Sequence, residues 1–341
     1  MSRSPSFAVI SGTQVHRAIM GREVQVTEII DTAYRLHGEG ATVNPDSYFL
    51  RLPDQPSSRI IALPASVKGD VLVHGMKWVS SFPENVSAGL PRASAVVILN
   101  DAESGYPFAC LEGSIISAAR TAASAALAAQ TLSEKRGTRP VSIGFIGAGL
   151  IARYIHKYLS GNGFKFDTLG VYDLSIASTE GFAGYLAKTE DGQIVKHDTA
   201  ESLIRSSDLI VFATVAAEPH IHDPDWFAHN PLVLHISLRD LSPKIILSSY
   251  NVVDDIEHCL KANTSPHLAE QQVRNRDFIG GTLYEVQSDA TRPPADMPVV
   301  FSPFGLGVLD LTIAKYVYDR VTAEGDLLTI SGFFHELKRH G

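Results

Sequence analysis

The chain has 341 residues, of which 45% are hydrophobic and 19% are charged, and its net charge is -8. This composition excludes a disordered chain, and the lack of a basic cluster argues against a nucleic-acid partner. The two cysteines, Cys110 and Cys259, form no CxxC pair, which favours a reducing compartment. Neither a signal peptide nor a membrane span is expected, so we predict a cytoplasmic protein without membrane contact.

The first part of the chain predicts a helix, a set of strands and a long helix, in that order. Residues 24–37 have apolar positions at helical spacing, whereas residues 48–99 form short apolar runs separated by Pro, Gly, Asn and Asp. A turn, "DAESGYP", precedes an alanine-rich helix expected over residues 111–132, and the polar linker "SEKRGTRP" follows it.

Beyond the linker, strands alternate with helices, which predicts a parallel sheet covered on both faces. From Pro303 on the pattern is again that of a helix. The expected fold is α/β. We expect a parallel-sheet domain, residues 133–302, to be inserted into a second domain of the α+β type that is built from residues 1–132 and 303–341.

The stretch "GFIGAGLIAR" contains Gly147, Gly149 and Ala152 in a GxGxxA pattern between an apolar strand and a helix. Gly147 allows a tight turn, Gly149 lets the backbone approach a pyrophosphate, and Ala152 allows close helix–strand packing. Asp173 closes the next strand, where it can accept hydrogen bonds from a ribose and repel a 2′-phosphate. This context predicts a site for NAD rather than NADP; another kind of α/β turn is the alternative.

Two cations stand in unusual surroundings. Lys77 in "HGMKWV" would share a strand face with Gly75 and Val79, where a lysine needs a shifted pKa or an anionic partner. Arg120 interrupts the small residues of the long helix, and it offers a fork to a carboxylate or phosphate beside the Thr121 hydroxyl. The alternatives are a solvated edge-strand lysine and an arginine on an exposed helix stripe.

Asp240 in "HISLRDLSP" lies just past a predicted strand. Parallel sheets present their sites beyond the carboxyl ends of their strands, so this aspartate is a candidate for acid–base work, with an ordinary turn aspartate as the alternative. The thirteen histidines show no metal-ligand spacing, although His220 and His222 form an HxH in a proline-flanked loop. We therefore predict no metal site.

The segments "KWVSSFPENVSAGLPRASAVVILNDAESGYPFACLEGSIISAARTAASAALAA" and "GFIGAGLIAR" resemble the ornithine cyclodeaminase and mu-crystallin family. The resemblance covers nearly the whole chain and implies an NAD(P)-binding Rossmann domain and a homodimer formed by the substrate domains. It also implies that Lys77 lies near the substrate carboxylate, that Arg120 binds this carboxylate, and that Asp240 is the catalytic aspartate. Thr121 would contact the cofactor phosphates, and Arg120 and Thr214 are expected at the cofactor as well.

Ornithine cyclodeaminases carry a glutamate in the strand that ends "MP", whereas Ile61 stands at that position here, and Arg59 suits an additional carboxylate. "RIIALP", "HGMKWVSSFPEN", "ASAVVILND" and "FSPFGLGVLDL" are most similar to the N-(2-amino-2-carboxyethyl)-L-glutamate dehydrogenases. These enzymes make L-2,3-diaminopropionate for siderophores and peptide antibiotics. Their substrate has three carboxylates, so Arg59, Arg51 and Arg92 are expected to bind it together with Arg120.

The resemblance implies NAD-dependent oxidation of the glutamate α-carbon to an imine, followed by hydrolysis to 2-oxoglutarate and L-2,3-diaminopropionate. Asp240 would be the general base, and Lys77 and Arg120 would fix the α-carboxylate. An ornithine cyclodeaminase, an alanine dehydrogenase and a cyclic ketimine reductase are the alternatives among enzymes. The residue Ile61 argues against the first and surplus arginines against the last. A non-catalytic small-ligand binding protein of the mu-crystallin type is the alternative from another class.

Overall fold

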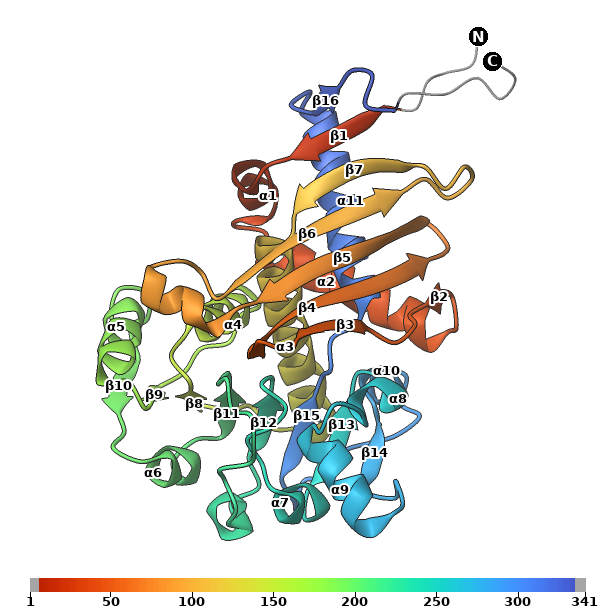
Figure 1. The fold of residues 1–341 in the computed structure, drawn as a ribbon. Helices are drawn as coiled ribbons and strands as arrows, with labels where there is room; N and C mark the ends of the chain where they lie inside the picture. Colours follow the sequence, from red (N-terminus) through yellow and green to blue (C-terminus); the bar gives the residue numbers. More distant parts are fainter. Residues whose placement is uncertain (1–5, 335–341) are drawn as a thin grey trace. The chain divides into compact units, whose positions relative to one another are not determined.

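The computed structural model describes residues 6–334, which form two compact units. The first unit contains the chain up to Arg120 and from Leu306 on, and the second contains Thr121–Gly305 (Figure 1). The boundary expected after residue 132 therefore moves to residue 120, inside helix α3 (Ser114–Arg136). Its last turn is held within the second unit, where Arg136 donates to the carbonyl oxygens of Asn230 and Pro294.

The first unit is built on a mixed sheet with the strand order β16-β1-β7-β6-β5-β4-β2, in which β3 also pairs with β4. Its strands are β1 (Phe7–Ile10), β2 (Thr42–Val43), β3 (Tyr48–Leu52), β4 (Gln55–Val67), β5 (Val73–Ser81), β6 (Ala93–Asn100), β7 (Pro107–Glu112) and β16 (Leu328–Ile330). Its helices, besides the start of α3, are α1 (Gly12–Ile19), α2 (Glu23–Gly38), η1 (Pro83–Ala88) and α11 (Gly307–Ala323).

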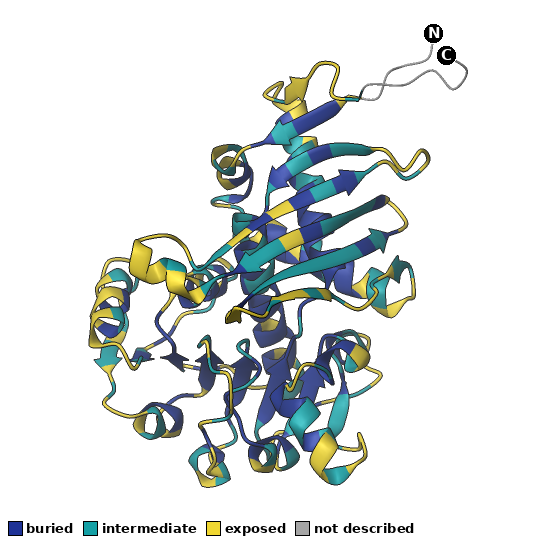
Figure 2. Ribbon diagram, in the orientation of Figure 1, coloured by how far each residue is buried: buried dark blue, intermediate teal, exposed yellow. Residues whose placement is uncertain are grey.

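Alternation of side chains divides this sheet into two faces. Helix α11 packs on one of them against β4, β5 and β6. On this face Val97 and Leu111 are fully buried and lie in register. On the opposite face Trp78 and Val96, also partners in register, remain exposed in the middle of their strands (Figure 2). One face of the sheet is therefore core, and the other presents apolar side chains to its surroundings.

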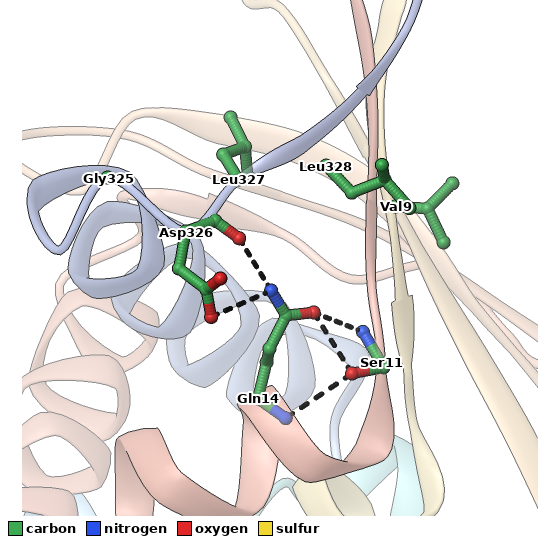
Figure 3. A pocket seen from close by; sticks show the side chains of 7 residues that line it. All are labelled: Val9, Ser11, Gln14, Gly325, Asp326, Leu327 and Leu328. Atoms are coloured by element: carbon green, nitrogen blue, oxygen red, sulfur yellow. Dashed lines mark hydrogen bonds between the residues drawn. The ribbon is translucent and has the colours of Figure 1, made fainter.

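Both ends of the described chain contribute to this sheet. Strand β1 pairs in parallel with β7 and antiparallel with β16. A hollow lies where β1 and α1 meet the segment after α11, lined by Val9, Ser11, Gln14, Gly325, Asp326, Leu327 and Leu328 (Figure 3). There the Gln14 amide donates to the Asp326 backbone oxygen at 2.6 Å and accepts from the Ser11 amide at 2.9 Å. No residue predicted for the site lines this hollow.

The second unit is built on an eight-stranded sheet with the order β10-β9-β8-β11-β12-β15-β13-β14, in which every pair is parallel. Its strands are β8 (Ser142–Ile146), β9 (Thr168–Tyr172), β10 (Gln193–Lys196), β11 (Leu209–Phe212), β12 (Leu232–His235), β13 (Tyr250–Val253), β14 (Ile279–Thr282) and β15 (Val299–Ser302). Its helices are α4 (Leu150–Gly161), α5 (Ile176–Leu186), α6 (Ala200–Arg205), η2 (Pro224–Phe227), α7 (Pro243–Leu247), α8 (Ile256–Cys259), α9 (Ser265–Val273) and α10 (Leu283–Gln287).

The central strands β11, β12 and β15 are buried along their whole length, as expected for a parallel sheet covered on both faces (Figure 2). Strand order reverses between β8 and β11, which is where sheets of this kind bind ligands at their carboxyl ends. The α/β fold predicted from the sequence, with a Rossmann-type sheet, is confirmed. Among residues 6–334, no helix combines the length and apolar character that crossing a membrane requires.

Two of the element boundaries that differ from the prediction are set by a local hydrogen bond. The long helix begins at Ser114 rather than at 111, because the Glu112 carboxylate at the end of β7 accepts from the Ser114 amide at 2.7 Å. The stretch "NVVDDIEHC", expected as a strand, ends as one at Val253. Asp255 then caps α8 by accepting from the His258 amide at 2.8 Å.

Candidate functional site

A buried group of charges occupies the core face of the first unit. Lys77 lies in β5 with its side chain 2% exposed, and its ammonium forms an ion pair with Asp310 Oδ2 at 2.7 Å. It also donates to Ser117 Oγ at 3.2 Å. Asp310, on α11, is fully buried, and its Oδ1 lies 3.4 Å from Nε of Arg120 on α3. The two predicted cations therefore meet around a carboxylate that the sequence analysis did not single out.

This cluster has two cations and one anion, so it retains one unit of positive charge away from water. Burial lowers the pKa of Lys77 to about 8; attraction by Asp310 opposes this shift, and repulsion by Arg120 adds to it. Unbalanced charge is costly in such surroundings, and a ligand carboxylate is the kind of group that would balance it. The exposed alternatives for Lys77 and Arg120 are thereby wrong, because the two side chains are 2% and 14% exposed.

Further arginines gather along the same sheet face. Arg51, Arg59 and Ser81 lie opposite one another on β3, β4 and β5, so their side chains share a face. Arg92 donates from Nη1 to Ser81 Oγ at 3.0 Å. Because Ser81 and Lys77 are four positions apart on one strand, they point to the same side of the sheet. The structure thus places all three predicted arginines along the face that carries Lys77.

Ile61 lies between the arginine row and Lys77. It is opposite Val79 in the β4–β5 pair, one step along the face from Arg59 and one from the Leu63–Lys77 pair. The position at which ornithine cyclodeaminases carry an acid is therefore apolar here and faces the same way as the charged cluster. An ammonium group at the far end of a substrate would find no carboxylate at Ile61.

The glycine turn joins β8 to α4 in the second unit. Gly147 has φ +92°, and a Cβ there would lie 2.6 Å from the Ala213 carbonyl oxygen, so only glycine fits. Gly149 is the N-cap of α4; no side chain caps it, and a Cβ there would meet no atom within 4 Å. Ala152 is fully buried against the sheet side of the helix. The turn leaves open space at the N-terminus of α4, which suits a phosphate group.

Asp173 follows β9 beside this turn. Its Oδ2 accepts from the Ala148 amide at 2.8 Å, and its Oδ1 accepts from the Ser175 amide at 2.8 Å. These bonds fix the carboxylate next to the glycine turn, where the sequence predicted a ribose contact. The open N-terminus of α4 would bind the pyrophosphate of NAD, and the Asp173 carboxylate would bind its ribose. The residues around the turn therefore fit that cofactor.

A second buried aspartate, Asp240, follows β12 in the second unit. Thr214, just beyond β11, donates its hydroxyl to Oδ1 of this residue, and Ser237 donates to Oδ2. His220 Nε2 lies 3.1 Å from Oδ1, and His235 Nε2 lies 3.3 Å from Oδ2. Thr214, expected at the cofactor, is therefore a hydrogen-bond partner of Asp240 in this structure.

The environment of Asp240 keeps it ionised. Burial alone would raise its pKa, but hydrogen bonds from His220, His235 and Ser237 outweigh burial and hold the pKa well below its usual range. His235 is fully buried, and its Nε2 accepts from the Asp240 backbone amide at 3.2 Å. Its other nitrogen lies 3.2 Å from Ser302 Oγ.

Sequence reasoning missed Asp310 and the bond between His220 and Asp240. An aspartate between two leucines in "GVLDLT" was the available signal for Asp310, since an acid at a buried helix position needs a partner. His220 was noted only as part of an HxH. In residues 6–334 no group of three or more His, Cys, Asp or Glu residues is arranged to bind a metal.

The ornithine cyclodeaminase/mu-crystallin family model matches residues 9–325, and the chain belongs to this family. Among curated proteins, the N-((2S)-2-amino-2-carboxyethyl)-L-glutamate dehydrogenase of Staphylococcus aureus is 28% identical over 88% of this chain and 91% of its own. An alanine dehydrogenase of Archaeoglobus fulgidus is 26% identical over 86% of this chain and 89% of its own. Two relatives that are about equally similar to this chain are thus named for different substrates.

Among solved structures, the Δ1-pyrroline-2-carboxylate reductase of Thermococcus litoralis, in complex with NADH and L-proline, has a TM-score of 0.86. It is 23% identical and covers 95% of this chain and 100% of its own. An archaeal alanine dehydrogenase dimer with bound NAD has a TM-score of 0.84 at 24% identity, and covers 96% and 100% of the two chains. Both likenesses show the fold.

Proposed function

We propose that the protein is an NAD-dependent dehydrogenase that cleaves N-(2-amino-2-carboxyethyl)-L-glutamate to L-2,3-diaminopropionate and 2-oxoglutarate. Such a reaction belongs to the biosynthesis of siderophores or peptide antibiotics. The observation that carries the proposal is the arginine row on the face of Lys77. Arg51 and Arg59 lie directly opposite each other on this face, and two guanidinium groups side by side suit a ligand with more than one carboxylate.

The number of cations favours one of the candidate substrates. Alanine, ornithine and a cyclic ketimine each present one carboxylate, for which the Lys77–Arg120 cluster is sufficient. The proposed substrate presents three, and Arg51, Arg59 and Arg92 supply further cations. Ile61 adds no acid that would pair with the distal ammonium of ornithine. The similarity to the Staphylococcus aureus dehydrogenase supports the same choice.

In the proposed mechanism, Lys77 and Arg120 bind the α-carboxylate of the glutamate moiety and thereby fix the direction of its Cα–H bond. When bound, NAD supplies the acceptor for the hydride of that bond. Gly147, Gly149 and Asp173 would hold the cofactor at the turn before α4, and Thr121 would contact its phosphates. Proton transfer to and from water and the substrate amine is assigned to the group centred on Asp240.

The test is to mix the purified protein with NAD and N-(2-amino-2-carboxyethyl)-L-glutamate, follow NADH absorbance, and assay both products. We expect NADH, 2-oxoglutarate and L-2,3-diaminopropionate in equal amounts. Arg59→Met should raise KM by about 10- to 100-fold, because one charge-assisted contact is lost, whereas Arg139→Met, in the exposed linker, should not. Turnover of alanine or Δ1-pyrroline-2-carboxylate with none of the tricarboxylate would contradict the proposal.

We also propose that the protein is a cytoplasmic homodimer, formed through the exposed sheet face of the first unit. Trp78 and Val96 are 40% and 38% exposed there, in the middle of β5 and β6, and Met76 and Ile98 extend the same face. Such a face is unusual on a monomer. Trp78→Glu should give a monomer in analytical ultracentrifugation, and a dimer that persists in this variant would contradict this interface.

A further inference from the structure

His220 lies in the segment between β11 and β12, and this segment forms several hydrogen bonds with Asp240 and its neighbour Leu241. The His220 and Ile221 amides both donate to the Asp240 carbonyl oxygen at 3.0 Å, and Ile221 forms a parallel bridge with Leu241. The imidazole Nε2 of His220 lies 3.1 Å from Asp240 Oδ1. Backbone and side chain therefore hold this imidazole in one orientation at the carboxyl edge of the parallel sheet.

Asp240 is poorly suited to accept a proton itself. It is fully buried, and both carboxylate oxygens accept hydrogen bonds, Oδ1 from Thr214 and Oδ2 from Ser237. These contacts and the histidines hold its pKa well below the usual range, so its basicity is low. A general base needs a lone pair that can reach the reacting proton and a basicity near that of the medium. The Asp240 carboxylate has neither.

The His220 imidazole has the properties that Asp240 lacks. Its side chain is 42% exposed, whereas the Asp240 side chain is 0% exposed. In the tautomer with the proton on Nε2, this nitrogen donates to Asp240 Oδ1 and the Nδ1 lone pair is available to accept a proton. Among residues 6–334, Asp240 is the one titratable side chain within hydrogen-bond distance of this ring; Glu218 and His222 flank it in the chain. An imidazole held by a buried carboxylate is the arrangement in which aspartate sets the tautomer and histidine moves the proton.

We infer that His220 is the proton-transferring residue of this enzyme and that Asp240 is the positioning residue that fixes its tautomer. The inference rests on the proposed function and assigns its acid–base step to a different side chain from the one that the sequence predicted. Asp240, the expected general base, then acts through His220.

His220 can carry every proton transfer that hydrolysis of the imine requires. Water adds to the carbon of the protonated imine, and one of its protons moves to Nδ1 of His220, which gives a neutral carbinolamine. His220 then returns this proton to the amine nitrogen. When the carbon–nitrogen bond breaks, its electron pair stays on nitrogen. The hydroxyl proton moves to the imidazole, and the imidazole then donates it to the released amine. The products are a ketone and an ammonium group, and His220 ends as it began.

The test compares His220→Gln with His222→Gln, which changes an exposed histidine of the same segment. We expect His220→Gln to lower kcat by about 10²- to 10⁴-fold with little change in KM, and to abolish the acidic limb of the pH profile. His222→Gln should remain near wild type. Added imidazole should restore part of the activity of His220→Ala. A His220→Gln enzyme that keeps kcat within about threefold, with its acidic limb intact, would overturn the assignment.

A second measurement does not depend on turnover. Nitrogen-15 spectra of the imidazoles should show His220 as the Nε2–H tautomer in wild type, and this preference should be lost in Asp240→Asn. His222 should be unchanged by that substitution. A His220 ring that is insensitive to Asp240→Asn would overturn the positioning role.

Failure of the proposed function is distinguishable from failure of this inference. If wild type oxidises another amino acid instead, the proposed substrate is wrong. The His220→Gln and His222→Gln comparison on that amino acid, with the tautomer spectra, then decides the role of His220. Thermal unfolding and NAD binding of each variant separate loss of catalysis from loss of folding.

Discussion

The two units each bury an aspartate at the centre of a polar cluster, but its partners differ. Asp310 in the first unit faces two permanent or nearly permanent cations, Lys77 and Arg120. Asp240 in the second unit faces hydroxyls and imidazoles, which hydrogen-bond without bringing a fixed charge. The cluster around Asp310 therefore has a net positive charge, whereas the carboxylate of Asp240 is fully hydrogen-bonded.

This difference separates binding from proton transfer. A cluster with one cation in excess attracts a carboxylate, and its charge persists over the pH range in which Lys77 stays protonated. A buried carboxylate that accepts several hydrogen bonds remains ionised and orients the groups that donate to it. Substitutions in each cluster should therefore have different kinetic and thermodynamic effects.

Arg120→Met should have the largest effect. It removes the excess cation from the Asp310 cluster, and a buried charge pair with a substrate carboxylate is lost, which costs about 3–5 kcal/mol. We expect kcat/KM to fall by about 10²- to 10⁴-fold, mainly through KM, in steady-state assays. Arg139→Met is the control. A variant that keeps its KM would show that the cluster does not bind the substrate.

Asp310→Asn should shift the alkaline limb of the pH profile. Lys77 must be protonated to bind a carboxylate, and its pKa lies at about 8, so kcat/KM should fall as pH rises through that value. Attraction by Asp310 raises this pKa, so removal of the carboxylate should move the limb to lower pH by about one to three pH units.

The matched control is Asp319→Asn on the same helix, because Asp319 is ion-paired with the nearby Lys315 and is 55% exposed. An unmoved limb in Asp310→Asn, or an equal shift in Asp319→Asn, would contradict the role of Asp310.

Asp240→Asn should affect stability in a pH-dependent way. The folded-state pKa of Asp240 is depressed, so its stabilisation is complete above the unfolded value of about 3.9 and is lost as acid protonates the carboxylate. Near pH 7 we expect Tm to fall by about 5–10 °C, because hydrogen bonds to a charged acceptor are lost. The gap between wild type and variant should narrow below about pH 4 in calorimetry. A gap that is constant with pH would contradict this account.

Asp173→Ala should have the smallest effect. Its carboxylate, fixed by the Ala148 and Ser175 amides, would repel a 2′-phosphate. We expect the preference for NAD over NADP, measured as the ratio of kcat/KM values, to fall by about tenfold, which corresponds to roughly 1.4 kcal/mol. Asp167→Ala, on the segment before β9, is the control. An unchanged ratio would show that Asp173 does not determine the preference for NAD over NADP.

Much of the fold could be predicted from the sequence, because its signals are local. The apolar spacing of residues 24–37 matches α2, and the strand, glycine turn and helix around Gly147 follow from propensity and turn chemistry. Lys77 and Arg120 could be singled out because a cation inside an apolar run is unusual in itself.

The partners of these residues could not be predicted, because they depend on tertiary contacts. Asp310 lies on a helix whose neighbours Leu309 and Leu311 are also buried, so no polar stripe shows which residue faces Lys77. His220 gains its role only when the segment after β11 folds back onto Asp240. The charge and hydrogen-bond balance of both clusters is therefore a property of the folded chain.

The position of α11 late in the chain has a consequence for folding. Lys77 and Asp310 are about 230 positions apart, and contacts between such distant residues form slowly. During synthesis, β4 to β7 and the two cations are made well before the helix that supplies their counter-ion and covers their face. We expect the first unit to be the slower of the two to fold, and to depend on chaperones until α11 emerges from the ribosome.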